Sequence, residues 1–204
     1  MRPSELLEVE VDSTSTGIDL GLLRRIAVRD EAALAELYDR HSRLAYSVIV
    51  RILRSSSDAE DVLQETFVRV WSRAETFDAL LGSPAAWVVR IARNRAIDRL
   101  RATRVRATVA GDPVREGNGE APRPVEAATR ETPETALQVD MTSRAVRSAV
   151  ATLSPAQREL IEAAFFEGCT HTELSTRFAL PLGTVKTRIR TGLMALRDRL
   201  EQVI

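Results

Sequence analysis

Residues 153–200 read LSPAQRELIEAAFFEGCTHTELSTRFALPLGTVKTRIRTGLMALRDRL, and this stretch predicts three helices with clear boundaries. Apolar residues recur at helical spacing in the first helix and stop at Gly168, because glycine readily adopts the positive φ that often ends a helix. Thr170 and Glu173 have the spacing of a capping box, so a second, short helix begins there. Pro181 fits the first position of the third helix. A short helix, a tight turn and a longer helix form the helix-turn-helix pattern, in which the second helix enters the major groove of DNA.

The third predicted helix has one apolar side and several cationic positions elsewhere. Its packing side is predicted to carry Val185, Ile189, Leu193, Leu196 and Leu200. Its candidate DNA contacts are Thr184, Lys186, Thr187, Arg188, Arg190 and Thr191. Between Gly183 and Leu200 there are five cations and one acid, Asp198. An ordinary solvated helix is the alternative, but the lack of carboxylates in the first turns favours a helix that faces phosphates.

The composition requires any nucleic-acid site to come from local clusters of charge. The chain has 204 residues and a formal net charge of zero, and this length allows two small domains or one of medium size. Cations concentrate in 90–106 and 183–199, whereas acids dominate 1–20 and 107–140. The single cysteine, Cys169, excludes an internal disulfide and is predicted to be a small core residue. No apolar run of about 18 residues and no secretory signal is present, which predicts a cytoplasmic protein without membrane insertion.

The first half of the chain predicts four helices after a polar tail. Residues 1–18 lack apolar periodicity and are expected to be a disordered tail. Helices are predicted for about 19–28, 30–53, 58–74 and 84–105. His41, on the apolar side of the second helix, is predicted to be a partly buried structural residue and not a metal ligand, because no other His or Cys lies near it in sequence. Ser57 and Glu60 have capping-box spacing at the start of the third helix.

The helix predicted for 58–74, DAEDVLQETFVRVWSRA, carries a polar and largely acidic row opposite its apolar face. We call this row the acidic ridge; it consists of Asp58, Glu60, Asp61, Gln64, Glu65 and Arg69. Acids in a first turn favour the helix dipole, which accounts for the first three residues without any function. Gln64 and Glu65 continue the ridge beyond the first turn, so it could dock on a basic protein surface.

The helix predicted for 84–105 is a second candidate for phosphate binding. Seven arginines and one acid, Asp98, lie between residues 90 and 106. One face is predicted to carry Arg90, Arg93, Ile97, Arg101 and Arg104, with Asn94 at its edge. The preceding segment, 76–82, is expected to be a non-helical loop. Its aromatic residue, Phe77, could stack on a base, but a core position is favoured by the residues alone.

Residues 107–136 are rich in Gly, Pro, Ala and acids and predict a flexible acidic linker. A helix returns near residue 134 and continues to about 151. The predicted fold class is therefore all-α, with two small helical domains, 19–106 and 137–204. The second of them is the helix-turn-helix domain.

These segments together resemble the extracytoplasmic-function (ECF) sigma factors of bacterial RNA polymerase. DAEDVLQETFVRVW, residues 58–71, is similar to their region two helix, which grips the coiled coil of the largest polymerase subunit. AAWVVRIARNRAIDRLR, residues 85–101, resembles their helix for the minus-ten promoter element. Residues 153–200 resemble region four, which reads the minus-thirty-five element. The resemblance covers about 20–105 and 137–200.

The resemblance implies roles for individual residues. It assigns polymerase binding to Asp61, Gln64 and Glu65. The predicted minus-ten residues are Phe77, Arg90, Arg93, Asn94 and Arg101, of which Asn94 and the Phe77 loop meet the melted strand. The predicted minus-thirty-five residues are Thr184, Lys186, Thr187, Arg188, Arg190 and Thr191. Thr191 stands where the family commonly has a cation, so the preferred upstream sequence is left open.

The implied function is that of a transcription initiation factor, with no enzymatic activity and no cofactor. Its expected partners are core RNA polymerase, promoter DNA and an anti-sigma factor, and the free protein is expected to be a monomer. A stand-alone helix-turn-helix regulator is the alternative, although the sequence offers no additional dimerisation domain or zipper. An all-helical enzyme is less favoured, because the sequence offers no nucleophile–base pair, metal-ligand cluster or Gly-rich phosphate loop.

Overall fold

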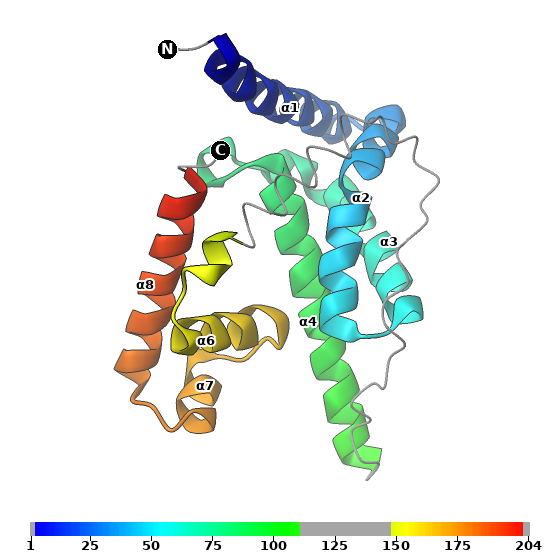
Figure 1. Ribbon diagram of the computed structural model, residues 1–204. Coiled ribbons are helices and arrows are strands. Elements are labelled where there is room, and N and C mark those ends of the chain that lie inside the picture. The colour runs from blue at the N-terminus through cyan, green and yellow to red at the C-terminus, as the bar shows by residue number, and fades with distance from the viewer. Residues whose placement is uncertain (1–2, 111–147, 202–204) are drawn as a thin grey trace. The chain divides into compact units, whose positions relative to one another are not determined.

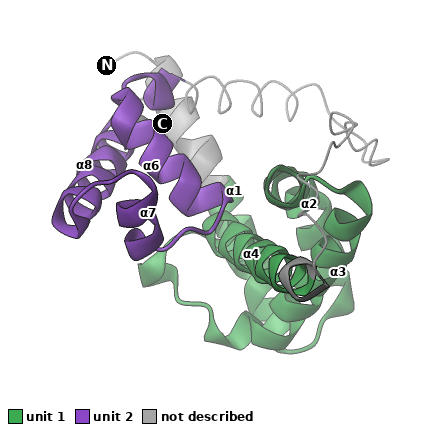
Figure 2. Cartoon of the chain, turned by 90° about the horizontal axis from the view of Figure 1, so that it is seen from below, with its two compact units in different colours: residues 1–127 green, residues 128–204 purple. Residues whose placement is uncertain are grey.

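The computed structural model describes residues 3–110 and 148–201, with the side chains of 15–106 and 148–199. Within these ranges the chain consists of helices and the turns between them, which confirms the all-α fold class. The chain divides into two compact units, unit 1 (residues 1–127) and unit 2 (residues 128–204), shown in Figure 2. Unit 1 contains α1 (Pro3–Ala27), α2 (Glu31–Leu53), α3 (Ser56–Arg73), the 3₁₀ turns η1 (Ala74–Thr76) and η2 (Ala79–Leu81), and α4 (Pro84–Ala110) (Figure 1). Unit 2 contains α6 (Pro155–Phe166), α7 (His171–Arg177) and α8 (Leu182–Glu201).

Local capping residues define the helix boundaries of unit 1. Asp30 starts α2, because its carboxylate accepts a hydrogen bond from the Ala33 backbone N–H at 3.1 Å. Arg54 ends α2 in the left-handed conformation, with φ 53°, and the extended Ser55 then caps α3. Ser83 accepts a hydrogen bond from the Ala86 backbone N–H at 3.3 Å at the start of α4, as predicted.

Helix α2 is the centre of unit 1 and packs against α1, α3 and α4. The core that these helices share includes Ile26, Leu37, Ile49, Val62 and Val88, all fully buried. This packing holds α3 and α4 together as neighbours, so the acidic ridge and the basic helix belong to one rigid framework.

A buried ion-pair cluster fastens α1 to α2. The Asp19 carboxylate lies 2.8 Å from His41 Nε2 and accepts a hydrogen bond from Arg40 Nε at 2.6 Å. Burial alone would raise the pKa of Asp19, but its hydrogen bonds and charge interactions with His41 and Arg40 hold that pKa below its ordinary value. His41 is 8% exposed, more buried than predicted, and its prediction as a structural residue is confirmed. Its partner Asp19 was not foreseen.

We expect Asp19→Asn to lower the free energy of unfolding at pH 7 by about 1–3 kcal/mol, since a buried charged hydrogen-bond acceptor is lost. A carboxylate with a lowered pKa stabilises the fold above its unfolded-state pKa, and this contribution disappears as the pH falls through the folded-state pKa. The difference between wild type and variant should therefore shrink below about pH 4. Urea unfolding followed by tryptophan fluorescence measures this, because both tryptophans, Trp71 and Trp87, lie in unit 1. The control is Asp39→Asn on exposed α2 surface, and an equal loss in the two variants would contradict the prediction.

Several predicted boundaries in unit 1 are wrong. Residues 3–18 belong to α1 and are not a disordered tail; once α1 is packed, extending it adds one hydrogen bond per residue fixed. Helix α3 begins at Ser56 and is capped by Ser55, not by the Ser57–Glu60 box. The left-handed Arg54 ends α2, so the next residue, Ser55, is already in position to cap α3. The segment predicted as a non-helical loop, 76–82, contains η2. Ile97 is 5% exposed and belongs to the core, not to the basic face.

The predicted helix boundaries of unit 2 are largely confirmed. Thr170 and Glu173 form the capping box of α7, and a second box, Ser154 with Gln157, starts α6. Gly168 turns the chain with φ 68° between these helices. Helix α8 begins at Leu182, one residue later than predicted.

The core of unit 2 forms where α6 and α7 pack against α8. It consists of Leu160, Ala163, Leu174, Val185 and Ile189, with Cys169 partly buried against them as predicted. The predicted packing side of α8 is wrong at Leu193, which is 51% exposed, whereas Leu196 is half-buried and the side chain of Leu200 lies outside the described residues. The buried residue at this level is Gly192, where a Cβ atom would lie 2.7 Å from Ile161 Cδ1.

The predicted linker and most of the helix expected for 134–151 lie outside the described residues. Helix α4 continues to Ala110, so residues 107–110, assigned to the linker, are helical. Residues 148–151 are helical, which agrees with the end of the predicted helix. The linker assignment itself stays a prediction.

Candidate functional site

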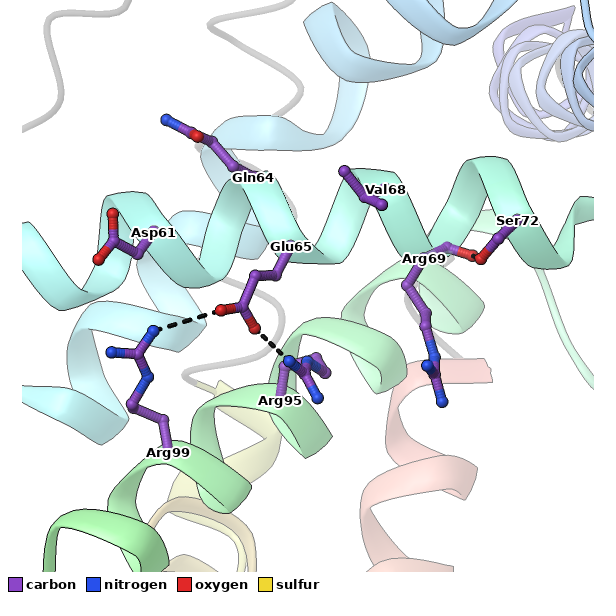
Figure 3. Close-up of a pocket in the computed structure, with 8 residues that line it drawn as sticks. All are labelled: Asp61, Gln64, Glu65, Val68, Arg69, Ser72, Arg95 and Arg99. Carbon is purple, nitrogen blue, oxygen red and sulfur yellow. Dashed lines mark hydrogen bonds and ion pairs between the residues drawn. The ribbon is translucent and has the colours of Figure 1, made fainter.

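The acidic ridge on α3 has an exposed part and a part that is bound to α4. Asp61 and Gln64 are exposed. Figure 3 shows that the Glu65 side chain points toward two arginines of α4, whereas Gln64 points away from them. Asp61, Gln64 and Glu65 line an open hollow of about 500 Å³ together with Val68, Arg69, Ser72, Arg95 and Arg99. The three residues predicted to bind polymerase therefore lie around one surface feature.

Glu65 is the centre of an ion-pair network between α3 and α4. Its carboxylate pairs with Arg95 and, at 3.3 Å, with Arg99 Nη2, and Arg99 Nη1 also lies 3.3 Å from Asp58. The hydrogen bond from Arg95, and then the charges of both arginines, hold the pKa of Glu65 below its ordinary value, although partial burial opposes this. The network neutralises Glu65 and Asp58, so Glu60 and Asp61 are the carboxylates of the ridge that stay exposed to an external partner, and Asp61 is the one beside the hollow.

Sequence reasoning grouped Arg95 and Arg99 with the other cations of the basic helix and missed their role. At about 100° per residue, Arg95 and Arg99 fall on nearly the same face of α4, roughly opposite Arg90 and Arg101. This helical spacing was the available signal. The basic helix therefore divides into arginines that hold α3 and arginines that face solvent.

The solvent side of α4 carries the predicted minus-ten residues. Arg90, Asn94 and Arg101 are exposed, and Arg93 is half-buried beside them. Arg93 Nη1 donates a hydrogen bond to Asn94 Oδ1 at 3.2 Å. Partial burial, and next the positive charge of Arg101, lower the pKa of Arg93. Like charges held this close are stabilised by a polyanion, which suits a surface for phosphates.

Phe77 belongs to the segment that precedes α4. Its ring is half-buried and meets the ring of the buried Trp87 edge to face, with centroids 5.6 Å apart. This contact agrees with the core position that the residues alone favoured. Stacking of Phe77 on a base stays a prediction.

In the helix-turn-helix of unit 2, α8 is the helix predicted to enter the major groove, the recognition helix of this motif. Lys186, Thr187, Arg190 and Thr191 are exposed, whereas Thr184 and Arg188 are half-buried at the flank of the packed face. Thr187 and Arg190 are on the side opposite the buried Val185 and Ile189, since α-helical residues advance about 100° each. The side of α8 that faces solvent thus presents Thr187 and Arg190, two of the residues predicted to contact the minus-thirty-five element.

Among the residues that the structure describes, no group of three or more His, Cys, Asp or Glu side chains is suited to a metal ion. In the same ranges, none of the helices has the length and apolar character needed to span a membrane.

Comparison with known proteins adds independent observations. Residues 37–106 match Sigma-70 region 2, and residues 149–198 match Sigma-70, region 4. The chain is similar to the ECF RNA polymerase sigma factor SigK of Mycobacterium tuberculosis strain H37Rv, with 37% identity over 180 residues, 88% of this chain and 92% of that protein. It is also similar to SigK of Mycobacterium sp. strain JLS, with 33% identity over 190 residues, 93% of this chain and 94% of that protein.

Two solved structures are similar to the chain. One is SigE of Rhodobacter sphaeroides in complex with the anti-sigma ChrR, with 33% identity, 88% of this chain and 96% of that chain covered, and a TM-score of 0.44. The other is CnrH in complex with the cytosolic domain of CnrY, with 22% identity, 91% and 98% covered, and a TM-score of 0.37.

Proposed function

Because the chain belongs to the ECF RNA polymerase sigma factors, we propose that it binds core RNA polymerase, directs it to a class of promoters and helps to open the duplex there. The observation that carries this proposal is the occurrence of regions 2 and 4 in one chain, in that order, with both regions rich in exposed cations. The factor performs no chemistry itself. Because its proposed partners are RNA polymerase and DNA, we place it in the cytoplasm.

The proposed division of labour follows the two units. On unit 1, Asp61 and Gln64 contact the polymerase, with Glu65 at the border of that contact and of the α3–α4 network. The exposed side of α4 binds the minus-ten strand through Arg90, Arg93, Asn94 and Arg101. On unit 2, the recognition helix binds the minus-thirty-five element. Two modest contacts joined in one chain give a combined affinity that neither unit has alone.

Run-off transcription with purified core polymerase tests the proposed function. The chain and core together should yield discrete transcripts from a subset of genomic fragments, and neither component should do so alone. A stand-alone helix-turn-helix regulator would bind DNA without giving transcripts from core polymerase. That outcome would refute the proposal.

Asn94→Ala should separate promoter opening from upstream binding. Asn94 is exposed beside the arginines of α4, and its family role lies with the single strand. We expect holoenzyme affinity for the closed promoter to stay within about twofold, since only one hydrogen-bonding side chain is removed. Permanganate reactivity of melted thymines should fall clearly. Equal reactivity in wild type and variant would remove Asn94 from the strand-binding residues.

Membership of this family also supports control by an anti-sigma factor. We propose that such a protein covers the acidic ridge and the basic helices and so keeps the chain from polymerase. The product of an adjacent, co-transcribed gene is the first candidate to express. Its addition should suppress run-off transcription by wild type, and undiminished transcription at saturating amounts would exclude that candidate.

A further inference from the structure

The side chain of Gln157 links helices α6 and α8 of unit 2. Its Nε2 donates a hydrogen bond to Thr191 Oγ1 at 3.2 Å, and its Oε1 accepts one from the Ser154 backbone N–H at 3.1 Å. Thr191 Oγ1 lies 3.0 Å from the Thr187 carbonyl and 3.2 Å from the Arg188 carbonyl, to which it donates. A chain of hydrogen bonds therefore runs from the cap of α6 to the backbone of the recognition helix.

The two helices touch closely at the same level. A Cβ atom on Gly192 would lie 2.7 Å from Ile161 Cδ1 and 3.4 Å from Gln157 Cβ. A glycine at a contact sets how near two helices come, but it has no side chain that interlocks and so fixes little of the rotation about the helix axis. The buried Val185 and Ile189 set which face of α8 packs inward, and the directional Gln157–Thr191 hydrogen bond adds a finer constraint on the rotation near Gly192.

The hydroxyl of Thr191 is already committed inside the protein. A threonine hydroxyl has a single proton, and here that proton goes to a carbonyl of α8. Phosphate oxygens only accept hydrogen bonds, so Thr191 can donate to one only by releasing this carbonyl. One lone pair of the same oxygen accepts from Gln157. This geometry fits a Thr191 side chain that links α6 to α8 better than one that contacts DNA.

We propose that Gln157 and Thr191 are positioning residues for promoter recognition, and this inference rests on the proposed function. Their hydrogen bond finely constrains the rotation of α8 about its axis and so aims Thr187 and Arg190 at the base edges. A rotation of about 10° moves a side chain by about 1 Å at the outer radius of a helix, enough to spoil a base-reading hydrogen bond. Gln157 lies on α6, outside every residue set predicted to contact DNA.

The test measures the affinity of the holoenzyme for a duplex promoter fragment selected from a randomised library and for the same fragment with its upstream element scrambled. Gln157→Ala and Thr191→Val should each lower the preference for the selected fragment by roughly three- to tenfold, the range that one hydrogen bond commonly contributes. The double variant should lose no more preference than Gln157→Ala alone, because that variant already lacks the shared bond; the Ser154–Gln157 cap that it also lacks should affect the melting temperature and not the preference. Thr191→Ser, which keeps the hydroxyl, should retain the preference.

Thr176→Val is the matched control, because the Thr176 hydroxyl donates to the Thr172 carbonyl of its own helix at 3.2 Å. It should leave the preference unchanged. A loss in Thr191→Val but not in Gln157→Ala would show that Thr191 contacts DNA directly and would overturn the proposal. So would lower melting temperatures with an unchanged preference, which indicate a role in stability alone. If wild-type holoenzyme itself shows no preference for the selected fragment, the proposed function fails first.

Discussion

Asp61→Arg should lower the affinity for core RNA polymerase by roughly 30-fold or more, because reversing a charge within a complementary interface places like charges opposite each other. Asp61 is exposed and makes no ion pair with the arginines of α4, unlike its neighbour Glu65. The change in the free energy of unfolding should therefore stay within about 0.5 kcal/mol. Titration of labelled chain with core polymerase, alongside urea unfolding, measures both effects. Glu36→Arg, on the exposed surface of α2, is the control. Wild-type affinity for core in Asp61→Arg would remove this residue from the interface.

The experiment on Glu65 needs a different set of variants, because Glu65 also forms ion pairs with α4. Glu65→Arg places a third cation beside Arg95 and Arg99 and should reduce both stability and core binding. Exchanging the charges, Glu65→Arg with Arg95→Glu, should restore much of the stability. If Glu65 also touches polymerase, core binding should stay low in the exchanged pair. Full recovery of core binding would mean that Glu65 acts only through its arginines.

Arg190→Ala should cost on the order of 1–3 kcal/mol in binding to the preferred upstream element and much less on a scrambled one. Arg190 is exposed on the side of α8 that faces away from the core, where a bidentate contact to guanine is geometrically possible. Arg188, half-buried at the flank, should serve phosphates instead. Arg188→Ala should weaken binding about equally on all sequences and lower the salt slope by roughly one unit.

Holoenzyme affinities at several salt concentrations, on selected and scrambled promoters, distinguish the two arginines. The paired variants control each other, since each removes one cation from the same helix. Equal losses for Arg188→Ala and Arg190→Ala on every sequence would show that α8 only grips the backbone. The assignment of base-reading residues would then be wrong.

The sequence predicted the helices whose ends carry strong local signals. Asp30 and Thr170 each accept a hydrogen bond from the backbone N–H three residues further on, and Gly168 turns the chain through its own φ, so these signals do not depend on the rest of the fold. The α1 helix was missed before residue 19 because its support comes from elsewhere: Arg40 of α2 reaches both Asp19 and Ser15. The apolar periodicity of one segment carries no information about a contact with another helix.

The predictions for the packing side of α8 and for the role of Glu65 failed for the same reason. A pattern of leucines pointed to Leu193, but the close approach of α6 buries Gly192, which carries no hydrophobic signal. Likewise, the acidic ridge was visible in α3 alone, whereas the partners of Glu65 lie on α4, 30 and 34 residues further along. The character of one helix face could be predicted from its own residues, but the residues that this face contacts on the neighbouring helix could not.

The tight contact at Gly192 has a consequence for engineering promoter choice. Because a methyl group there would meet Ile161 Cδ1 at 2.7 Å, a residue larger than glycine at this position requires either Ile161 to change its rotamer or α8 to move away from α6. Exposed residues such as Lys186, Thr187 and Arg190 can be exchanged for those of another sigma factor without touching that contact. Where a donor has alanine at the matching position and its helix lies further out as a result, its base-reading residues would reach a shifted register on this scaffold. Grafts from donors with glycine there should transfer their promoter choice more faithfully than grafts from the others.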